Sequence, residues 1–329
     1  MTAPWIASQL RDLLTQRGHA WLLHGPSGLG QYTLGLSLAQ AWLCDRPTPA
    51  GACGECASCH QVAVRAHTDL AVLMPETEML ALGWPLSEKA QSELDDKKRK
   101  PSREIRVDAM RDALEFAQRT SGRGRGKVVM VYPAERMNPV TANALLKTLE
   151  EPAGDMRFVL ATEASHQLLP TIRSRCQGHA LAWPTLEEAA AWLQEQGVAS
   201  AAAPGLLRAA GGRPEDALRL HQSGLDARTW SQWPKALVRG DTGVMADWSP
   251  GQLVEALQKL CHDLLAVRSG AQPRFFETGD LPMAGSLESL TGWWRDLTET
   301  AKTVDHPFNA GLMMEALVAQ ARTALNSKA

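Results

Sequence analysis

The spacing of apolar residues predicts alternating strands and helices over the first 180 residues. Short continuous apolar runs, typical of buried strands, are followed by stretches with apolar residues at helical intervals. The predicted strands are residues 20–23, 70–74, 127–131 and 157–162, and the predicted helices are residues 4–18, 31–43, 107–118, 138–149 and 168–173. This alternation is typical of an α/β fold with a parallel sheet between helices. The polar stretch 84–104 is interpreted as a solvated loop.

Beyond about residue 184 the pattern changes, and only helical periodicity remains. The predicted helices are residues 185–196, 201–210, 214–222, 229–238, 250–268, 286–302 and 309–326. A softer boundary falls near 222–228, inside this all-helical half. We therefore expect three domains, over residues 1–180, 181–224 and 225–329.

Composition narrows the class of protein. The chain has 329 residues, 44% of them hydrophobic and 21% charged, with a formal net charge of −2. That length exceeds one ordinary core, and a near-neutral charge excludes binding of polyanions over the whole surface. No run approaches the ~20 apolar residues of a membrane span, and the N-terminus lacks the pattern of a secretion signal. We expect a cytoplasmic protein with no membrane partner.

A glycine loop follows the first predicted strand and opens a helix. Its glycines are Gly25, Gly28 and Gly30. A working phosphate loop reads G-x-x-x-x-G-K-[ST], in which the lysine neutralises phosphate charge and the hydroxyl binds magnesium. Here those two positions hold Gln31 and Tyr32. We expect a degenerate loop without a functional ATP site, although an unrelated glycine turn would have the same spacing.

The strand at residues 127–131 should end in acidic residues if the protein hydrolysed ATP. The sequence gives Tyr132 and Pro133 instead. Both the phosphate-loop residues and the acidic residues that hydrolysis requires are thus replaced. This favours a protein that keeps the fold of an ATPase but does not hydrolyse ATP. The alternative is an active ATPase with an unconventional loop, which would use Glu135 and Thr33.

Four of the six cysteines lie close together in the sequence, in the series Cys53-x2-Cys56-x2-Cys59 with Cys44 nine residues earlier. In a reducing cytosol such a cluster is more typical of a metal site than of disulfides. Four thiolates suit tetrahedral zinc, whereas the common iron–sulfur run requires a further cysteine at the position of Ala63. We predict a structural zinc site in an insert at about residues 44–60.

Three later segments resemble the clamp-loader subunits of bacterial DNA polymerase III, which belong to the AAA+ superfamily. Residues 143–152 read NALLKTLEEP, similar to a helix that these subunits share. Residues 174–176 read SRC, similar to their arginine-finger motif, and LPTIR precedes them. Residues 158–162, FVLAT, are similar to the strand that carries the first nucleotide sensor. The resemblance covers about residues 1–220.

The resemblance implies an AAA+ P-loop domain with an inserted zinc module, followed by a small helical lid and an all-helical collar. Catalytic members carry Lys and Asp at the positions of Gln31 and Tyr132, so this chain is similar to the non-hydrolysing structural (stator) subunit. Implied partners are the ATPase subunits gamma and tau and the delta subunit in a five-membered ring, with the sliding clamp and primer-template DNA. Ser174 and Arg175 would then act on a neighbour's nucleotide. The alternative for Arg175 is an ion pair at a helix end.

Two further features have plain alternatives. Residues 97–127 are locally basic, which suits either a surface for DNA or a solvated loop with a glycine-rich turn. Arg213, after a glycine pair, lies where the family often carries a second sensor, but a helix start explains it equally well.

Overall fold

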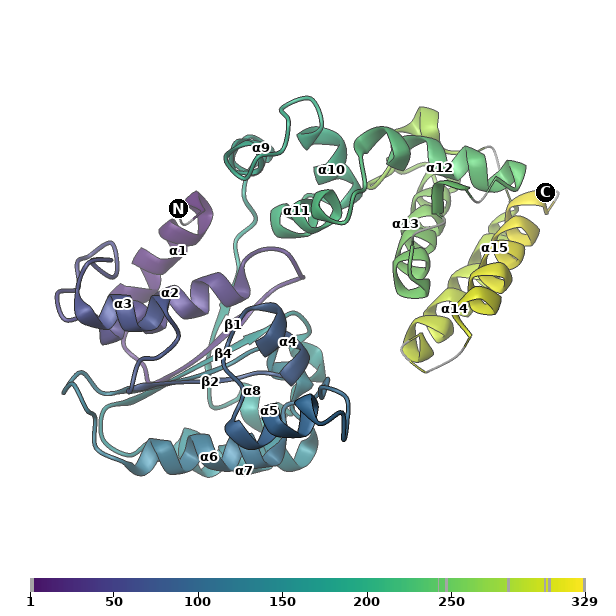
Figure 1. The fold of residues 1–329 in the computed structure, drawn as a ribbon. Coiled ribbons are helices and arrows are strands. Elements are labelled where there is room, and N and C mark those ends of the chain that lie inside the picture. Colours follow the sequence, from purple (N-terminus) through teal and green to yellow (C-terminus); the bar gives the residue numbers. More distant parts are fainter. Residues whose placement is uncertain are drawn as a thin grey trace. The chain divides into compact units, whose positions relative to one another are not determined.

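The computed structural model describes residues 3–241, 243–245, 248–282, 285–304, 306 and 309–327 (Figure 1). The chain divides into two compact units, Met1–Pro184 and Thr185–Ala329. The further boundary near residue 224, inside the second unit, stays a prediction. Within the described residues, no helix has both the length and the apolar character that crossing a membrane requires.

The first unit contains a five-stranded parallel sheet. Its strands are β1 (Ala20–His24), β2 (Leu70–Leu73), β3 (Lys127–Val131), β4 (Met156–Thr162) and β5 (Gln177–Ala180), in the order β2-β3-β4-β1-β5. The four strands predicted from apolar runs are confirmed. Strand β5 was not predicted, because its four residues are mostly exposed and form no apolar run. It is defined by its backbone pairing with β1.

Helices cover both faces of this sheet (Figure 1). They are α1 (Pro4–Thr15), α2 (Gln31–Leu43), α3 (Ala57–Ala63), α4 (Glu76–Ala81), α5 (Glu88–Asp95), α6 (Val107–Gln118), α7 (Pro139–Glu150) and α8 (Pro170–Arg173). Helices α6 and α7 pack on one face through residues such as Ala113 and Leu145, which meet Phe158 of the sheet. On the other face α2 packs closely, because a side chain at Gly35 would lie 2.9 Å from Met130 Cε.

The interpretation of residues 84–104 as a loop was wrong in part. Helix α5 lies there, and the Ser87 side chain caps it by accepting a hydrogen bond from the backbone N–H of Ala90. Arg99 then donates to Glu93 at 2.7 Å and to both carboxylate oxygens of Glu76. Periodicity gave no signal because none of the residues of α5 is buried, and the cap and the ion pairs hold it instead.

The second unit is helical throughout its described residues, as predicted. It contains α9 (Leu186–Glu195), α10 (Ala203–Ala209), α11 (Pro214–Gln222), α12 (Ala227–Arg239), α13 (Pro250–Arg268), α14 (Leu287–Thr303) and α15 (Ala310–Asn326). Capping boxes at Thr185 and Ser249 start α9 and α13. The side chain of Asn309 caps α15 by accepting a hydrogen bond from the backbone N–H of Leu312.

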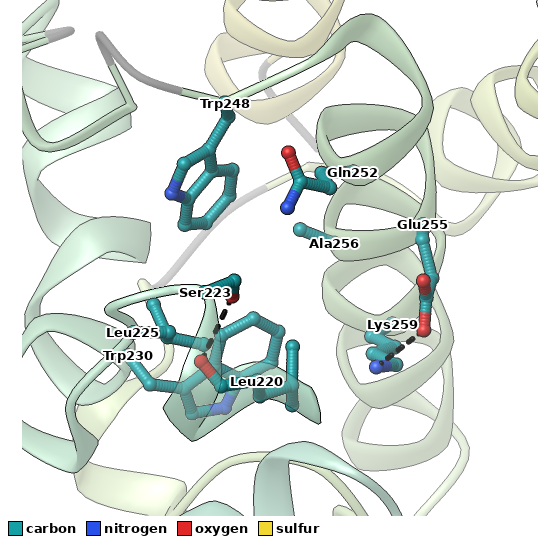
Figure 2. Close-up of a pocket in the computed structure, with 9 residues that line it drawn as sticks. All are labelled: Leu220, Ser223, Leu225, Trp230, Trp248, Gln252, Glu255, Ala256 and Lys259. Carbon is teal, nitrogen blue, oxygen red and sulfur yellow. Dashed lines mark hydrogen bonds and ion pairs between the residues drawn. The ribbon is translucent and has the colours of Figure 1, made fainter. Parts of the chain in front are cut away.

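Aromatic residues form the centre of the second unit. The rings of Trp230 and Phe276 stack, with their centroids 4.7 Å apart. A cavity of about 40 Å³ lies beside Trp230, and Trp248 and Lys259 of α13 also line it (Figure 2). Lys259 is buried, and its charge is offset by an ion pair of 2.7 Å with Glu255, one turn earlier on the helix.

A buried carboxylate fixes the loop that carries Phe275 and Phe276. Asp263 of α13 is 0% exposed and accepts hydrogen bonds from the backbone N–H groups of Arg274, Phe275 and Phe276, at 2.7–2.9 Å. An unpaired buried N–H costs about as much as a lost hydrogen bond, so the three contacts hold the loop against the helix.

We predict that Asp263→Ala destabilises the protein by about 3 kcal/mol, because three buried donors lose their acceptor. Asp263→Asn, which keeps one acceptor oxygen, should lose less. Urea unfolding followed by tryptophan fluorescence measures both changes. The matched control is Glu299→Ala, which removes an exposed ion pair with Lys302; equal stability of Asp263→Ala and this control would contradict the prediction.

Candidate nucleotide site and cysteine cluster

The glycine loop lies between β1 and α2, as predicted, at the carboxyl edge of the parallel sheet. Gly28 and Gly30 have φ values of 76° and 97°, in the left-handed region that favours glycine. The indole N–H of Trp5, on α1, donates to the carbonyl oxygen of Leu29 at 2.9 Å. The loop is therefore fixed both by its own backbone and by the first helix.

Gln31 occupies the position of the phosphate-loop cation and is 2% exposed. Its side-chain Nε2 donates to the carbonyl oxygens of Gly25 and Pro26, at 2.9 and 2.7 Å. Both amide hydrogens are thus used by the loop itself. The residue closes the loop on its own backbone and presents no positive charge to a ligand.

Aromatic side chains occupy the two positions at which an active site of this kind would bind a metal ion: Tyr32 after the glycine loop and Tyr132 after β3. The rings of Tyr32 and Tyr132 meet at a tilt of 42°, with their centroids 5.4 Å apart. The hydroxyl of Tyr32 accepts a hydrogen bond of 2.7 Å from the indole of Trp84, which is buried. The end of β3 therefore carries a packed aromatic contact at the position expected of a metal-binding carboxylate.

Glu135, the acid considered for an active enzyme, also has partners. Its Oε2 accepts a hydrogen bond of 2.7 Å from the buried hydroxyl of Thr162, and its Oε1 accepts one of 3.2 Å from the backbone N–H of Glu163. The carboxylate thus joins the turn after β3 to the end of β4. Thr33, the other residue of that hypothesis, is half-buried on α2.

Arg175 follows α8, and its side chain is 31% exposed. Its Nε donates to Glu150 Oε1 at 2.7 Å, its Nη2 contacts the same oxygen, and its Nη1 donates to the carbonyl of Thr171 at 2.9 Å. Ser174 donates to that carbonyl at 3.2 Å. The alternative interpretation of Arg175, an ion pair at a helix end, describes this arrangement. An exposed pair of this kind contributes about 0–1 kcal/mol, so the guanidinium can exchange it for another anion.

The four clustered cysteines come together in space. Their sulfur atoms all lie within 4.8 Å of one another, and the Cys44 Sγ is 3.5, 3.8 and 3.6 Å from those of Cys53, Cys56 and Cys59. Four thiolates bound tetrahedrally at the usual zinc–sulfur distance lie about 3.8 Å apart. The donor set and its spacing therefore fit a tetrahedral metal ion.

Secondary structure places these sulfurs. Cys44 ends α2, Cys56 caps α3, and Cys59 lies within α3. The backbone N–H groups of Glu55 and Cys56 lower the pKa of Cys53 to about 6, which favours the thiolate that a metal needs. All six cysteines of the chain are free thiols.

Sequence reasoning missed a polar contact beside the cluster. Asp45 accepts a hydrogen bond of 2.8 Å from Ser58 and one of 3.0 Å from the guanidinium of Arg123, and these contacts lower its pKa to about 2. Arg123 lies in the glycine-rich turn, and the buried carboxylate of Asp69 accepts the backbone N–H groups of Gly122 and Arg123. No local motif signals the contacts of Arg123 and Gly122 with these two carboxylates, because the partners lie more than 50 residues apart.

The basic stretch at 97–127 is neutralised in part by its own surroundings. Arg99, Arg119 and Arg123 each pair with a carboxylate. At these three positions the contacts fit a solvated loop and turn better than a free surface for DNA. Arg213, in the second unit, pairs with Asp216 at 2.5 Å at the start of α11, as expected of a helix start.

Comparison with known proteins identifies the family. The family model described as DNA polymerase III, delta subunit, matches residues 7–184. The DNA polymerase III subunit delta' of Pseudomonas aeruginosa is 40% identical over 212 residues, 64% of this chain and 58% of that protein. The delta' subunit of Escherichia coli is 34% identical over 225 residues, 67% of this chain and 60% of its own. The E. coli tau subunit is 31% identical over 158 residues, 48% of this chain and 20% of its own.

The matched segment spans 58% and 60% of these two delta' relatives. A solved gamma subunit-related protein from Thermotoga maritima aligns with 97% of this chain and 99% of its own, at 17% identity, but its TM-score of 0.47 is too low to support a conclusion. The resemblance of the sequence to DNA polymerase III subunits is confirmed. Because the family model covers more than half of the chain, this protein belongs to the DNA polymerase III delta subunit family.

Proposed function

We propose that this chain is a structural subunit of a bacterial DNA polymerase III clamp loader and does not hydrolyse ATP itself. The proposal rests mainly on the contacts of Gln31. Its side-chain amide donates hydrogen bonds to two carbonyl oxygens of the phosphate loop and supplies no positive charge. Hydrogen bonds to ionised groups are worth about 1.5–3 kcal/mol against about 1 for neutral ones, so the substitution weakens both phosphate binding and stabilisation of the charge that develops during transfer.

The competing hypothesis, an ATPase with an unconventional loop, is less well supported. It relies on Glu135 to activate water, but both oxygens of that carboxylate accept hydrogen bonds from Thr162 and Glu163. It also requires a metal ligand at the end of β3, where Tyr132 packs on Tyr32. Hydrolysis would require both arrangements to break.

We predict that the purified chain shows no magnesium-dependent ATP turnover and that Gln31→Lys binds ATP roughly tenfold more tightly, because the new ammonium adds a charge-assisted contact. Turnover should remain absent in the variant, since Tyr132 supplies no carboxylate. Calorimetric binding and phosphate release measure the two effects. Gln40→Lys, on the same helix but away from the loop, is the control, and turnover by the unaltered chain would exclude the proposal.

The same proposal gives Arg175 a role in a neighbouring subunit. An arginine finger stabilises the charge on a nucleotide held across an interface. Supporting this role, the guanidinium is partly exposed and its present partner, Glu150, is a surface carboxylate. The neighbours would be the gamma or tau ATPase subunits and the delta subunit in a five-membered ring that acts on the sliding clamp and primer-template DNA.

Replacement of Arg175 by alanine tests that role. In the reconstituted complex we expect hydrolysis at the adjacent nucleotide site to fall roughly a thousandfold, the scale reported for arginine fingers. Clamp- and DNA-stimulated phosphate release provides the rate, with size-exclusion chromatography to check assembly. Arg173→Ala, two residues earlier and exposed, should leave the rate unchanged. An unchanged rate for the Arg175 variant would remove the finger from the proposal.

We also propose that Cys44, Cys53, Cys56 and Cys59 hold one structural zinc ion. Sulfur distances of 3.5–4.0 Å in four of the pairs, with all four sulfurs within 4.8 Å of one another, support a closed tetrahedron without an open coordination position. Bound zinc would fix an insert that has little apolar core of its own. With all four coordination positions filled by cysteine sulfurs, the zinc ion would have a structural role.

Elemental analysis should find one zinc ion for each chain. We expect Cys56→Ser to lose the metal, because three thiolates bind zinc far more weakly than four, and to lower the melting temperature. Cys176→Ser, outside the cluster, is the matched control and should retain the ion. Iron at this stoichiometry, or no metal in the freshly purified protein, would contradict the assignment.

A further inference from the structure

A hollow of about 460 Å³ lies on the first unit, at the edge of the sheet opposite the phosphate loop. Arg125 precedes β3 by two residues, and Arg157 is the second residue of β4, so both belong to the amino edge of these parallel strands. Trp42 at the end of α2 and the loop containing Pro47 and Pro49 complete the walls. We call this feature the arginine hollow.

The guanidinium groups of both arginines line the same hollow and lack a hydrogen-bonding protein partner among the described residues. Arg157 lies over the ring of Trp42, with its Cζ 5.1 Å from the ring centroid. Within the described residues, the side chains of Arg157 and Arg125 form no ion pair and no hydrogen bond, whereas those of Arg99, Arg119 and Arg123 are all paired with carboxylates. Burial lowers the pKa of Arg157, and the nearby charge of Arg125 lowers it further. Unsatisfied guanidinium donors are therefore gathered in one place.

No carboxylate lines the hollow. Asp155 is close enough for its charge to act on Arg157, but it forms no ion pair with it and lies outside the lining. Arg157 is half-buried beside apolar walls, and the exposed Arg125 adds a like charge nearby. Because arginine cannot lose its proton, an anion bound between the two guanidinium groups would be favourable. An alternative role for Arg157 is to cap the carboxyl end of α2 by donating to its last carbonyl oxygens. No such hydrogen bond forms within the described residues.

We propose that the arginine hollow binds the phosphate group of a nucleotide, either free or within a single nucleic-acid strand. Guanidinium groups bind phosphate oxygens through paired N–H donors, and two of them can hold one phosphate from two sides. The volume is in the range of about 300–1,000 Å³ that is usual for small-ligand pockets, so it leaves room for a sugar and a base against the tryptophan and proline walls. The site is separate from the degenerate phosphate loop and does not depend on that loop's role.

Binding of a fluorescein-labelled oligothymidylate to the full chain, followed by fluorescence anisotropy over a range of salt concentrations, tests the proposal. We expect Arg125→Gln and Arg157→Gln each to weaken binding roughly tenfold, which corresponds to the loss of one charge-assisted contact. Each should also reduce the slope of log affinity against log salt by about 0.7. Arg125 is exposed, so its variant remains informative if Arg157→Gln fails to fold.

The control is Arg119→Gln, which removes the same charge from an exposed pair in the same unit and should bind as the unaltered chain does. Inorganic pyrophosphate and a mononucleotide are the competitors that separate the two sources of phosphate. Competition at millimolar concentration supports a site for free nucleotides, and its absence supports a site for a strand. The proposal is overturned if the unaltered chain does not bind, if all three variants weaken equally, or if poly-glutamate of matched charge binds equally well.

Discussion

The candidate site depends on a pair of hydrogen bonds that an amide makes where a cation belongs. Gln31 bonds the carbonyl groups of Gly25 and Pro26, and this closes the glycine loop without help from a ligand. A lysine at that position would carry a positive charge that needs an anionic partner, and a bound phosphate would supply it. A buried neutral amide is satisfied by the backbone alone. The glycine loop can therefore stay ordered without a bound ligand.

The surroundings are consistent with that closed state. Trp5 fixes the loop from α1, and Tyr132 packs against Tyr32 at the end of β3. Glu135 joins β3 to β4 through Thr162. Each contact takes up a polar or aromatic group that a hydrolytic site would leave free for metal or water. These contacts all lie within the chain, and they support the proposal of a subunit that does not hydrolyse ATP.

Sequence patterns predicted the parts of the fold that burial determines. The buried strands and the long helices were found because apolar spacing reflects the core directly. Strand β5 and helix α5 were missed, since exposed polar residues form them and pairing with β1, or ion pairs of Arg99, hold them. The cysteines were grouped by spacing alone. The contacts of Asp45 with Arg123 and of Arg175 with Glu150 join distant positions, and no local pattern encodes them.

One glycine links features that are separate in the sequence. Gly35 allows α2 to lie directly on the sheet, and that helix begins at Gln31 of the closed loop and ends beside Trp42 and Cys44. Its 13 residues form a rod of about 20 Å. A methyl group at position 35 would lie 2.9 Å from the terminal methyl of Met130, which can turn away, and 3.2 Å from Cγ1 of Val159, which leaves room for a shift of only a few tenths of an ångström. The phosphate loop, the first thiolate and one wall of the arginine hollow thus share one helix whose distance from the sheet is set at a single position.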